Sequence, residues 1–68
     1  MEKKLLLQII KFDQSVTLFR LTTRKGSQMY NVEYSDEEFP EDDVRLNFDE
    51  FTAALAEYRL IKRNYNLA

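Results

Sequence analysis

The sequence predicts an α+β domain in which a four-stranded antiparallel meander is followed by one C-terminal helix. Three observations lead to this fold class. The first half of the chain alternates apolar, β-branched and aromatic segments with turn signals, as in strands joined by hairpins. The last third has the apolar period of a helix, and an acidic segment with the only proline separates the two regions. The expected element order is therefore ββββα, in a single domain of residues 1–68.

The predicted helix has a start signal, an apolar face and a stop signal. Asn47 is a good N-cap, and Glu50 three residues later completes a capping box. Leu46 and Phe51 have the spacing of a hydrophobic staple, which fixes how the chain enters the helix. We therefore expect a helix over about residues 48–63.

The composition of this helix supports the assignment. Apolar residues recur at steps of three and four, acids open the helix, and bases close it, in the sense that the helix dipole favours. Asn64 or Asn66 is expected to end the helix in a left-handed conformation.

The first two strands are expected at residues 4–12 and 15–23, joined by a tight turn at Asp13 and Gln14. The first is a continuous apolar run, which is typical of a central strand covered on both faces. The second is rich in the β-branched and aromatic residues that favour strands. Together they predict a hairpin.

A third strand is expected at residues 28–34, where the apolar residues alternate, after a turn in which Gly26 adopts a positive φ. Residues 35–43, SDEEFPEDD, hold six acids among nine residues and are expected to form a solvent-exposed loop with Phe39 as its apolar anchor. A short fourth strand at residues 44–46 then leads into the helix.

The predicted core combines apolar residues of the strands and of the helix. The candidates are Leu5, Leu7, Ile9, Leu18, Phe19, Leu21, Val32, Leu46, Phe51, Leu55, Tyr58 and Ile61. A chain of 68 residues buries only about 60% of its unfolded surface, so this core is marginal. The chain has no cysteine that could form a stabilising disulfide. We therefore expect a homodimer, in which each copy covers apolar surface that the other would leave exposed to solvent.

The N-terminal residues MEKKLLLQIIKF place two lysines before an apolar run, as a signal peptide does. Gln8 and Lys11 interrupt this run, however, and no small-residue cleavage site follows. We expect a cytoplasmic protein without a membrane span.

Catalysis has little support in the sequence. Histidine and cysteine are absent, and there is no glycine-rich phosphate loop and no nucleophile with a base. The carboxylates gather in a hydrophilic segment that offers no burial to raise a pKa. We expect a protein that is not an enzyme and needs no cofactor. The acids could chelate Ca²⁺ or Mg²⁺, but they lack the ligand spacing and glycine of an EF-hand, so we expect no metal.

Charge is distributed unevenly along the chain. Residues 1–34 carry six bases against three acids, whereas residues 35–51 carry eight acids against Arg45 alone. Single-stranded nucleic acid is recognised by a positive surface together with aromatic platforms for the bases. The candidate residues for such a surface are Lys11, Phe19, Arg20, Arg24, Lys25, Tyr30 and Tyr34. The other interpretation of the aromatic residues is ordinary packing under the helix or at a dimer interface.

The acidic loop gives an alternative function. Its charge could imitate the phosphates of DNA and bind a basic protein partner, as an inhibitor does, by complementary charge. The candidate residues are Asp36, Glu37, Glu38, Phe39, Glu41, Asp42 and Asp43. A solubilising loop is the simpler interpretation of the same segment.

A family resemblance supports the nucleic-acid hypothesis. The order of four strands and one helix, with the segment VRLNFDEFTAAL at residues 44–55, resembles the PUR-alpha repeat and the related transcriptional coactivator fold. The resemblance implies a curved antiparallel sheet that binds single-stranded DNA or RNA, and a dimer made by packing of two helices. The acidic composition of the chain departs from that pattern, and no family binding residue is transferred to it.

Overall fold

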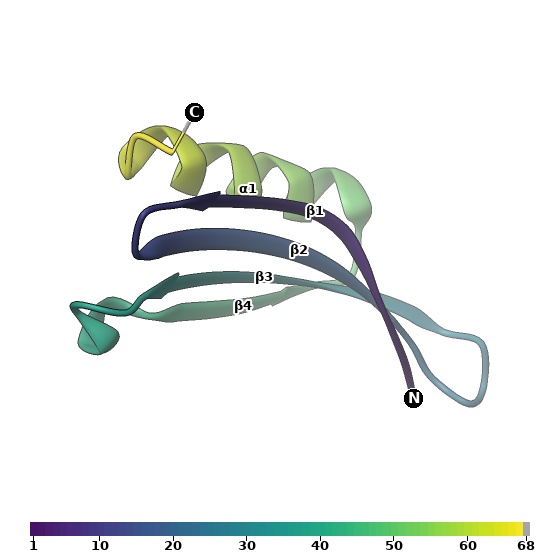
Figure 1. Ribbon diagram of the computed structural model, residues 1–68. Helices are drawn as coiled ribbons and strands as arrows, with labels where there is room; N and C mark the ends of the chain where they lie inside the picture. Colours follow the sequence, from purple (N-terminus) through teal and green to yellow (C-terminus); the bar gives the residue numbers. More distant parts are fainter. Residues whose placement is uncertain (68) are drawn as a thin grey trace.

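The computed structural model describes residues 1–67 as one four-stranded antiparallel sheet with a helix on one face (Figure 1). The strands lie in the order β1-β2-β3-β4, so each pairs with its neighbour in sequence. The elements are β1 Glu2–Lys11, β2 Gln14–Thr22, β3 Gln28–Asp36, the 3₁₀ turn η1 Pro40–Asp42, β4 Val44–Phe48 and α1 Phe51–Asn64. The predicted ββββα meander is confirmed.

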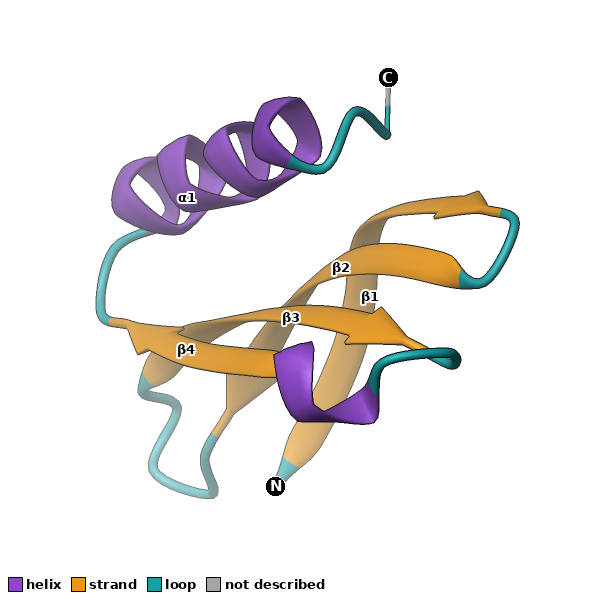
Figure 2. Ribbon diagram, turned by 90° about the vertical axis from the view of Figure 1, so that its left-hand side faces the viewer, coloured by secondary structure: helices purple, strands orange, loops and turns teal. Residues whose placement is uncertain are grey.

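The helix α1 lies over one face of the sheet, here called the helix face, and leaves the other, here called the open face, uncovered (Figure 2). It packs against β2, β3 and β4, while no Cα of α1 lies within 8 Å of a Cα in β1. The strand order makes β1 an edge strand, and α1 does not cover it. The expectation that this strand is central and covered on both faces is therefore wrong. Within residues 1–67 no helix is long and apolar enough to cross a membrane.

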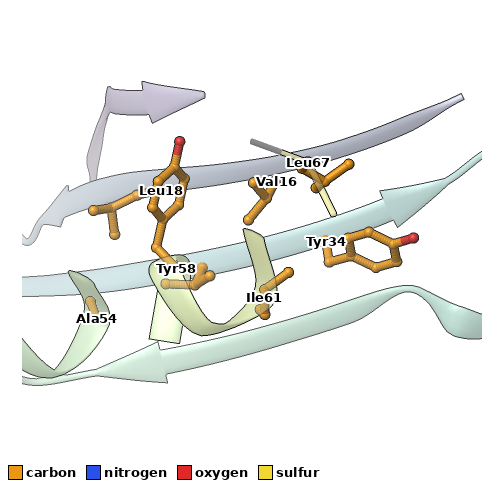
Figure 3. Close-up of a cluster of buried hydrophobic side chains, with 8 residues drawn as sticks. Val16, Leu18, Tyr34, Ala54, Tyr58, Ile61 and Leu67 are labelled. Carbon is orange, nitrogen blue, oxygen red and sulfur yellow. The ribbon is translucent and has the colours of Figure 1, made fainter. Parts of the chain in front are cut away.

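The core lies between α1 and the middle of the sheet (Figure 3). Alternate residues of β2 and β3 point to the helix face, and register pairs Val16 with Tyr34 and Leu18 with Val32. The buried apolar residues are Val16, Leu18, Val32, Tyr34, Ala54, Tyr58, Ile61 and Leu67. Leu6, Ile9, Tyr30, Val44, Phe48 and Leu55 pack around them and are partly buried.

The predicted core is correct at its centre and wrong at its margins. Leu18, Val32, Tyr58 and Ile61 are buried, and Ile9 and Leu55 pack against the buried cluster. Phe19, Leu21 and Leu46 are half-buried, whereas Leu5, Leu7 and Phe51 are exposed by 49%, 40% and 40%. Leu5 and Leu7 lie on β1, which α1 does not cover. Phe51 lies in the first turn of α1, where its ring contacts Tyr30 but stays partly in solvent.

The helix begins three residues later than the sequence predicts. Its N-cap is Glu50, in an extended conformation and without a side-chain capping bond. Asn47 instead belongs to β4, where it pairs with Asn31 and accepts a hydrogen bond of 3.0 Å from the Asn31 side-chain amide. Strand pairing therefore takes precedence over the predicted capping box, and Leu46 cannot act as the residue before a helix cap.

Two of the expected left-handed residues are confirmed. Gly26 has φ 85° in the β2–β3 loop, and Asn66 has φ 57° after the helix. The turn between β1 and β2 lies one residue earlier than expected. Phe12 and Asp13 form it, in place of Asp13 and Gln14, and Phe12 has φ 55°. A positive φ is unusual for a bulky side chain, and this one is 90% exposed.

The chain after α1 turns back over the core. The Leu67 amide donates to the Lys62 carbonyl at 2.8 Å, one turn below, while Asn66 is left-handed. This is the hydrogen-bond pattern of a Schellman helix end. It places Leu67 against the buried cluster, where it is 2% exposed.

Leu67→Ala is expected to lower the free energy of unfolding by about 2–5 kcal/mol, because it empties a buried site. Leu60→Ala is the matched control, since Leu60 is 38% exposed on α1 and should cost less than about 1 kcal/mol. Denaturant unfolding of both variants measures the difference. Equal losses would contradict the assignment of Leu67 to the core.

Candidate functional site

The sheet gathers five bases at one end, here called the basic end: Lys3, Lys4, Arg20, Arg24 and Lys25. Register places Lys3 opposite Leu21 and Lys4 opposite Arg20, so the start of β1 lies beside the end of β2. The β2–β3 loop that carries Arg24 and Lys25 projects at the same end as the N-terminus (Figure 1). Residues that are up to 22 positions apart in the sequence thus form one positive region.

On the open face of the basic end, Lys3 covers an aromatic ring. Its Nζ lies 4.0 Å from the centroid of Phe19, a cation–π contact, and 3.6 Å from a carboxylate oxygen of Glu33. Arg45 also approaches Glu33, at 3.7 Å. Both bases are largely exposed, so these ion pairs contribute little to stability.

On the helix face of the basic end, register aligns Lys4, Arg20 and Tyr30 in one row across three strands. The Nε of Arg20 is buried without a hydrogen-bond partner. Tyr30 is half-buried and packs edge-to-face on Phe51, with ring centroids 5.6 Å apart. Bases and an aromatic ring therefore lie together just beyond the first turn of α1.

The loop at the tip of the basic end is closed by its own hydrogen bonds. The Thr23 amide donates to the Ser27 carbonyl at 2.9 Å, and the Gly26 amide donates to the Thr23 carbonyl at 3.0 Å. The Ser27 amide also donates to the Thr23 hydroxyl at 3.1 Å. Arg24 and Lys25 are exposed on this loop, and neither forms an ion pair with an acid in the described part of the chain.

Two of the predicted nucleic-acid residues lie at the opposite end. Lys11 donates from Nζ to the Asn66 carbonyl at 3.0 Å and so ties β1 to the chain after α1. Tyr34 is 1% exposed and its ring stacks on Tyr65 at 3.9 Å between centroids. Its packing agrees with the simpler interpretation of the aromatic residues.

Tyr34 also takes part in a buried hydrogen-bond chain. The Gln14 side-chain amide donates to the Tyr34 hydroxyl at 2.9 Å, and that hydroxyl donates to the Asp36 carboxylate at 3.3 Å. Burial raises the pKa of Tyr34, the Gln14 hydrogen bond opposes this, and the neighbouring Asp36 carboxylate adds to it. Burial alone raises the pKa of Tyr58.

Of the seven candidates, the structure brings four together: Arg20, Arg24, Lys25 and Tyr30. Phe19 lies at the same end but on the open face, and Lys11 and Tyr34 are remote. The sequence reasoning missed Lys3 and Lys4 as members of this group. Their presence follows from hairpin register, because the start of one strand in a two-residue hairpin faces the end of the next.

The acidic loop lies at the other end of the sheet, beside the β1–β2 turn (Figure 1). The Asp36 carboxylate accepts from the backbone amides of Glu38 and Phe39 at 2.9 and 3.1 Å, and the Asp43 carboxylate accepts from the Asp36 amide at 2.9 Å. These bonds and η1 give the loop a defined shape. Glu37, Glu38, Glu41 and Asp42 are exposed on it.

The end of the sheet that carries the acidic loop is here called the acidic end, and two exposed phenylalanines, Phe12 and Phe39, border it. The Glu37 amide donates to the Asp13 carbonyl at 3.0 Å, which joins the acidic loop to the turn that carries Phe12. A surface hollow of about 240 Å³ lies between Phe12 and Phe39 and is also lined by Asp36 and Glu38. Among residues 1–67 no three carboxylates come together in a way that could hold a metal ion.

Comparison of the chain with family models, curated proteins and solved structures finds no match. The resemblance to the PUR-alpha repeat therefore stays a prediction.

The tyrosine pKa shifts predict alkaline destabilisation. Both folded-state values lie above the ordinary value of 10.0, so the folded state keeps its phenolic protons longer than the unfolded state. The resulting stability is fully present below pH 10 and is lost as pH rises above it. The free energy of unfolding, measured with denaturant between pH 8 and 11, should fall with rising pH, and it should fall less in Tyr34→Phe and in Tyr58→Phe. A pH dependence of the unfolding free energy that neither substitution changes would contradict this prediction.

Proposed function

We propose that this chain is a cytoplasmic, non-enzymatic binding module that holds single-stranded nucleic acid at its basic end. The observation that carries the proposal is the row of Lys4, Arg20 and Tyr30 on one face, continued by the exposed bases of the β2–β3 loop. Positive charge contacts phosphates without regard to sequence, and an aromatic ring stacks on a base. This combination favours a flexible single strand, whose bases can leave the stack.

The proposed path of the strand runs along the helix face. Phosphates contact Arg24 and Lys25 at the tip and then the guanidinium of Arg20, which is half-buried on the helix face opposite Tyr30. Tyr30 offers its ring at the end of this row, supported from the side by Phe51. The same function follows from the resemblance to PUR-alpha repeats, whose curved sheets bind single-stranded DNA or RNA.

Arg24→Ala/Lys25→Ala is expected to weaken binding of a labelled single-stranded oligonucleotide. Each phosphate contact on a single strand contributes about 0.7 to the slope of log K against log salt, so two lost contacts make it shallower by about 1.4. Fluorescence anisotropy at several salt concentrations measures both effects. Both side chains are exposed on the loop, so the fold should be unaffected.

Arg59→Ala/Arg63→Ala is the matched control, because it removes the same charge from two exposed positions of α1. It should reduce affinity much less and leave the slope nearly unchanged. Equal effects of the two double variants would show that binding depends only on the net charge of the chain and not on the basic end. No binding of the unmodified chain at low salt would refute the proposed function.

A second candidate function is binding of a basic protein partner at the acidic end. The observation that favours it is the defined shape of this loop, together with the exposed Phe12 and Phe39 beside it. A pre-formed acidic surface with apolar anchors loses little entropy when it binds. Complementary charge would then steer the partner to it.

Reversing Glu37, Glu38, Glu41 and Asp42 to lysine is expected to abolish capture of a basic partner in a pull-down. Asp36 and Asp43 stay unchanged, because their carboxylates hold the loop through backbone hydrogen bonds. Reversal of Asp49 and Glu57, outside the acidic end, serves as the control and should leave capture intact. Capture that survives the fourfold reversal would argue against this function.

A further inference from the structure

We propose that the free edge of β1 pairs with β1 of a second copy, in an antiparallel two-fold arrangement that joins the two sheets. The strand has ten residues, lies at the edge of the sheet, and is not covered by α1. A long edge strand presents unpaired backbone N–H and C=O groups that favour pairing with another chain. Its exposed residues include Leu5, Leu7 and Ile10, and Ile10 is 68% exposed.

The direction of each backbone group follows from the pairing with β2. Lys11 and Gln14 flank a two-residue turn, so they form a hydrogen-bonded pair, and such pairs alternate along an antiparallel ladder. Residues Ile9 and Leu7 therefore also direct their N–H and C=O groups toward β2. Gln8 and Ile10 direct theirs away from the sheet.

The β-bulge in β1 changes this alternation. Register passes from Leu7, opposite Leu18, to Leu5, opposite Phe19, so Leu6 is an extra residue. Beyond the bulge the outward-directed residues are Leu5 and Lys3. The free edge thus offers Lys3, Leu5, Gln8 and Ile10, and all four are exposed.

This irregular spacing selects the occupant. The outward-directed residues are two positions apart from Lys3 to Leu5 and from Gln8 to Ile10, but three positions apart from Leu5 to Gln8. A regular strand offers hydrogen-bonding groups at every second residue and cannot match this spacing, so the bulge discourages pairing with unrelated edges. A second copy of β1 matches them in one antiparallel register. Lys3 then faces Ile10 and Leu5 faces Gln8, with the bulge of one copy opposite the bulge of the other.

The charges of the strand agree with the same register. Glu2 of each copy faces Lys11 of the other, which pairs opposite charges at both ends. Lys4 faces Ile9, so no two lysines are opposed. The two-fold axis is perpendicular to the sheet, which keeps both helices on one face and brings the exposed Leu7 side chains of the two copies near the axis.

The first test is the oligomeric state of the full chain by sedimentation over a concentration series. A dimer is expected, and a monomer at millimolar concentration would overturn the proposal. Gln8→Pro removes one outward N–H without touching the ladder to β2, and should raise the dissociation constant by about tenfold or more. Gln8→Thr loses the same side-chain bond to Thr17 but keeps the N–H, so it should still dimerise.

The second test fixes the register and does not depend on the proline variant. The chain has no cysteine, so Lys3→Cys and Ile10→Cys can be prepared separately and mixed under oxidising conditions. The mixture should form a disulfide-linked pair, because hydrogen-bonded partners lie within disulfide reach. Neither variant alone should cross-link, because identical residues lie about 23 Å apart at 3.3 Å per residue. Cross-linking of a single variant as fast as the mixture, or none in the mixture, would refute this interface.

Discussion

The register between β2 and β3 is the constraint on which the rest of the structure depends. It sets Leu18 opposite Val32 on the helix face, where α1 covers them, and it sets Arg20 opposite Tyr30 on the same face beyond the helix. Side chains alternate with a period of two, so a slip of one residue would move this entire set to the open face. One ladder thus defines both the buried core and the positive surface that we propose as the binding site.

The sequence was sufficient for the fold because local signals agree over most of its length. Strand propensity, the turn at Gly26 and the amphipathic last third all indicate the observed meander and helix. It was misleading where two local structures competed for the same residues. Asn47 has the side chain of a helix cap, but its pairing with Asn31 extends β4 through Phe48. A continuous apolar run also cannot distinguish a central strand from an edge strand, so the position of β1 needed the topology.

The candidate site was only partly accessible to sequence reasoning, because a list of bases and aromatic residues does not say which face or end they occupy. Register brings Arg20, Arg24, Lys25 and Tyr30 together and adds Lys4 from a distant part of the chain. It also sends Tyr34 into the core, where its hydroxyl is held by Gln14 and Asp36. The charge asymmetry along the sequence corresponds in space to two ends of an elongated molecule, 38 Å in its longest extent.

The most direct test of this account is a measurement of the β2–β3 register in solution by nuclear Overhauser contacts between backbone protons. The observed register predicts cross-strand contacts that join Leu18 to Val32 and Arg20 to Tyr30. Contacts that join Leu18 to Asn31 or to Glu33 would instead show a ladder shifted by one residue. That result would exchange the two faces of β2 and contradict both the core and the basic end described above.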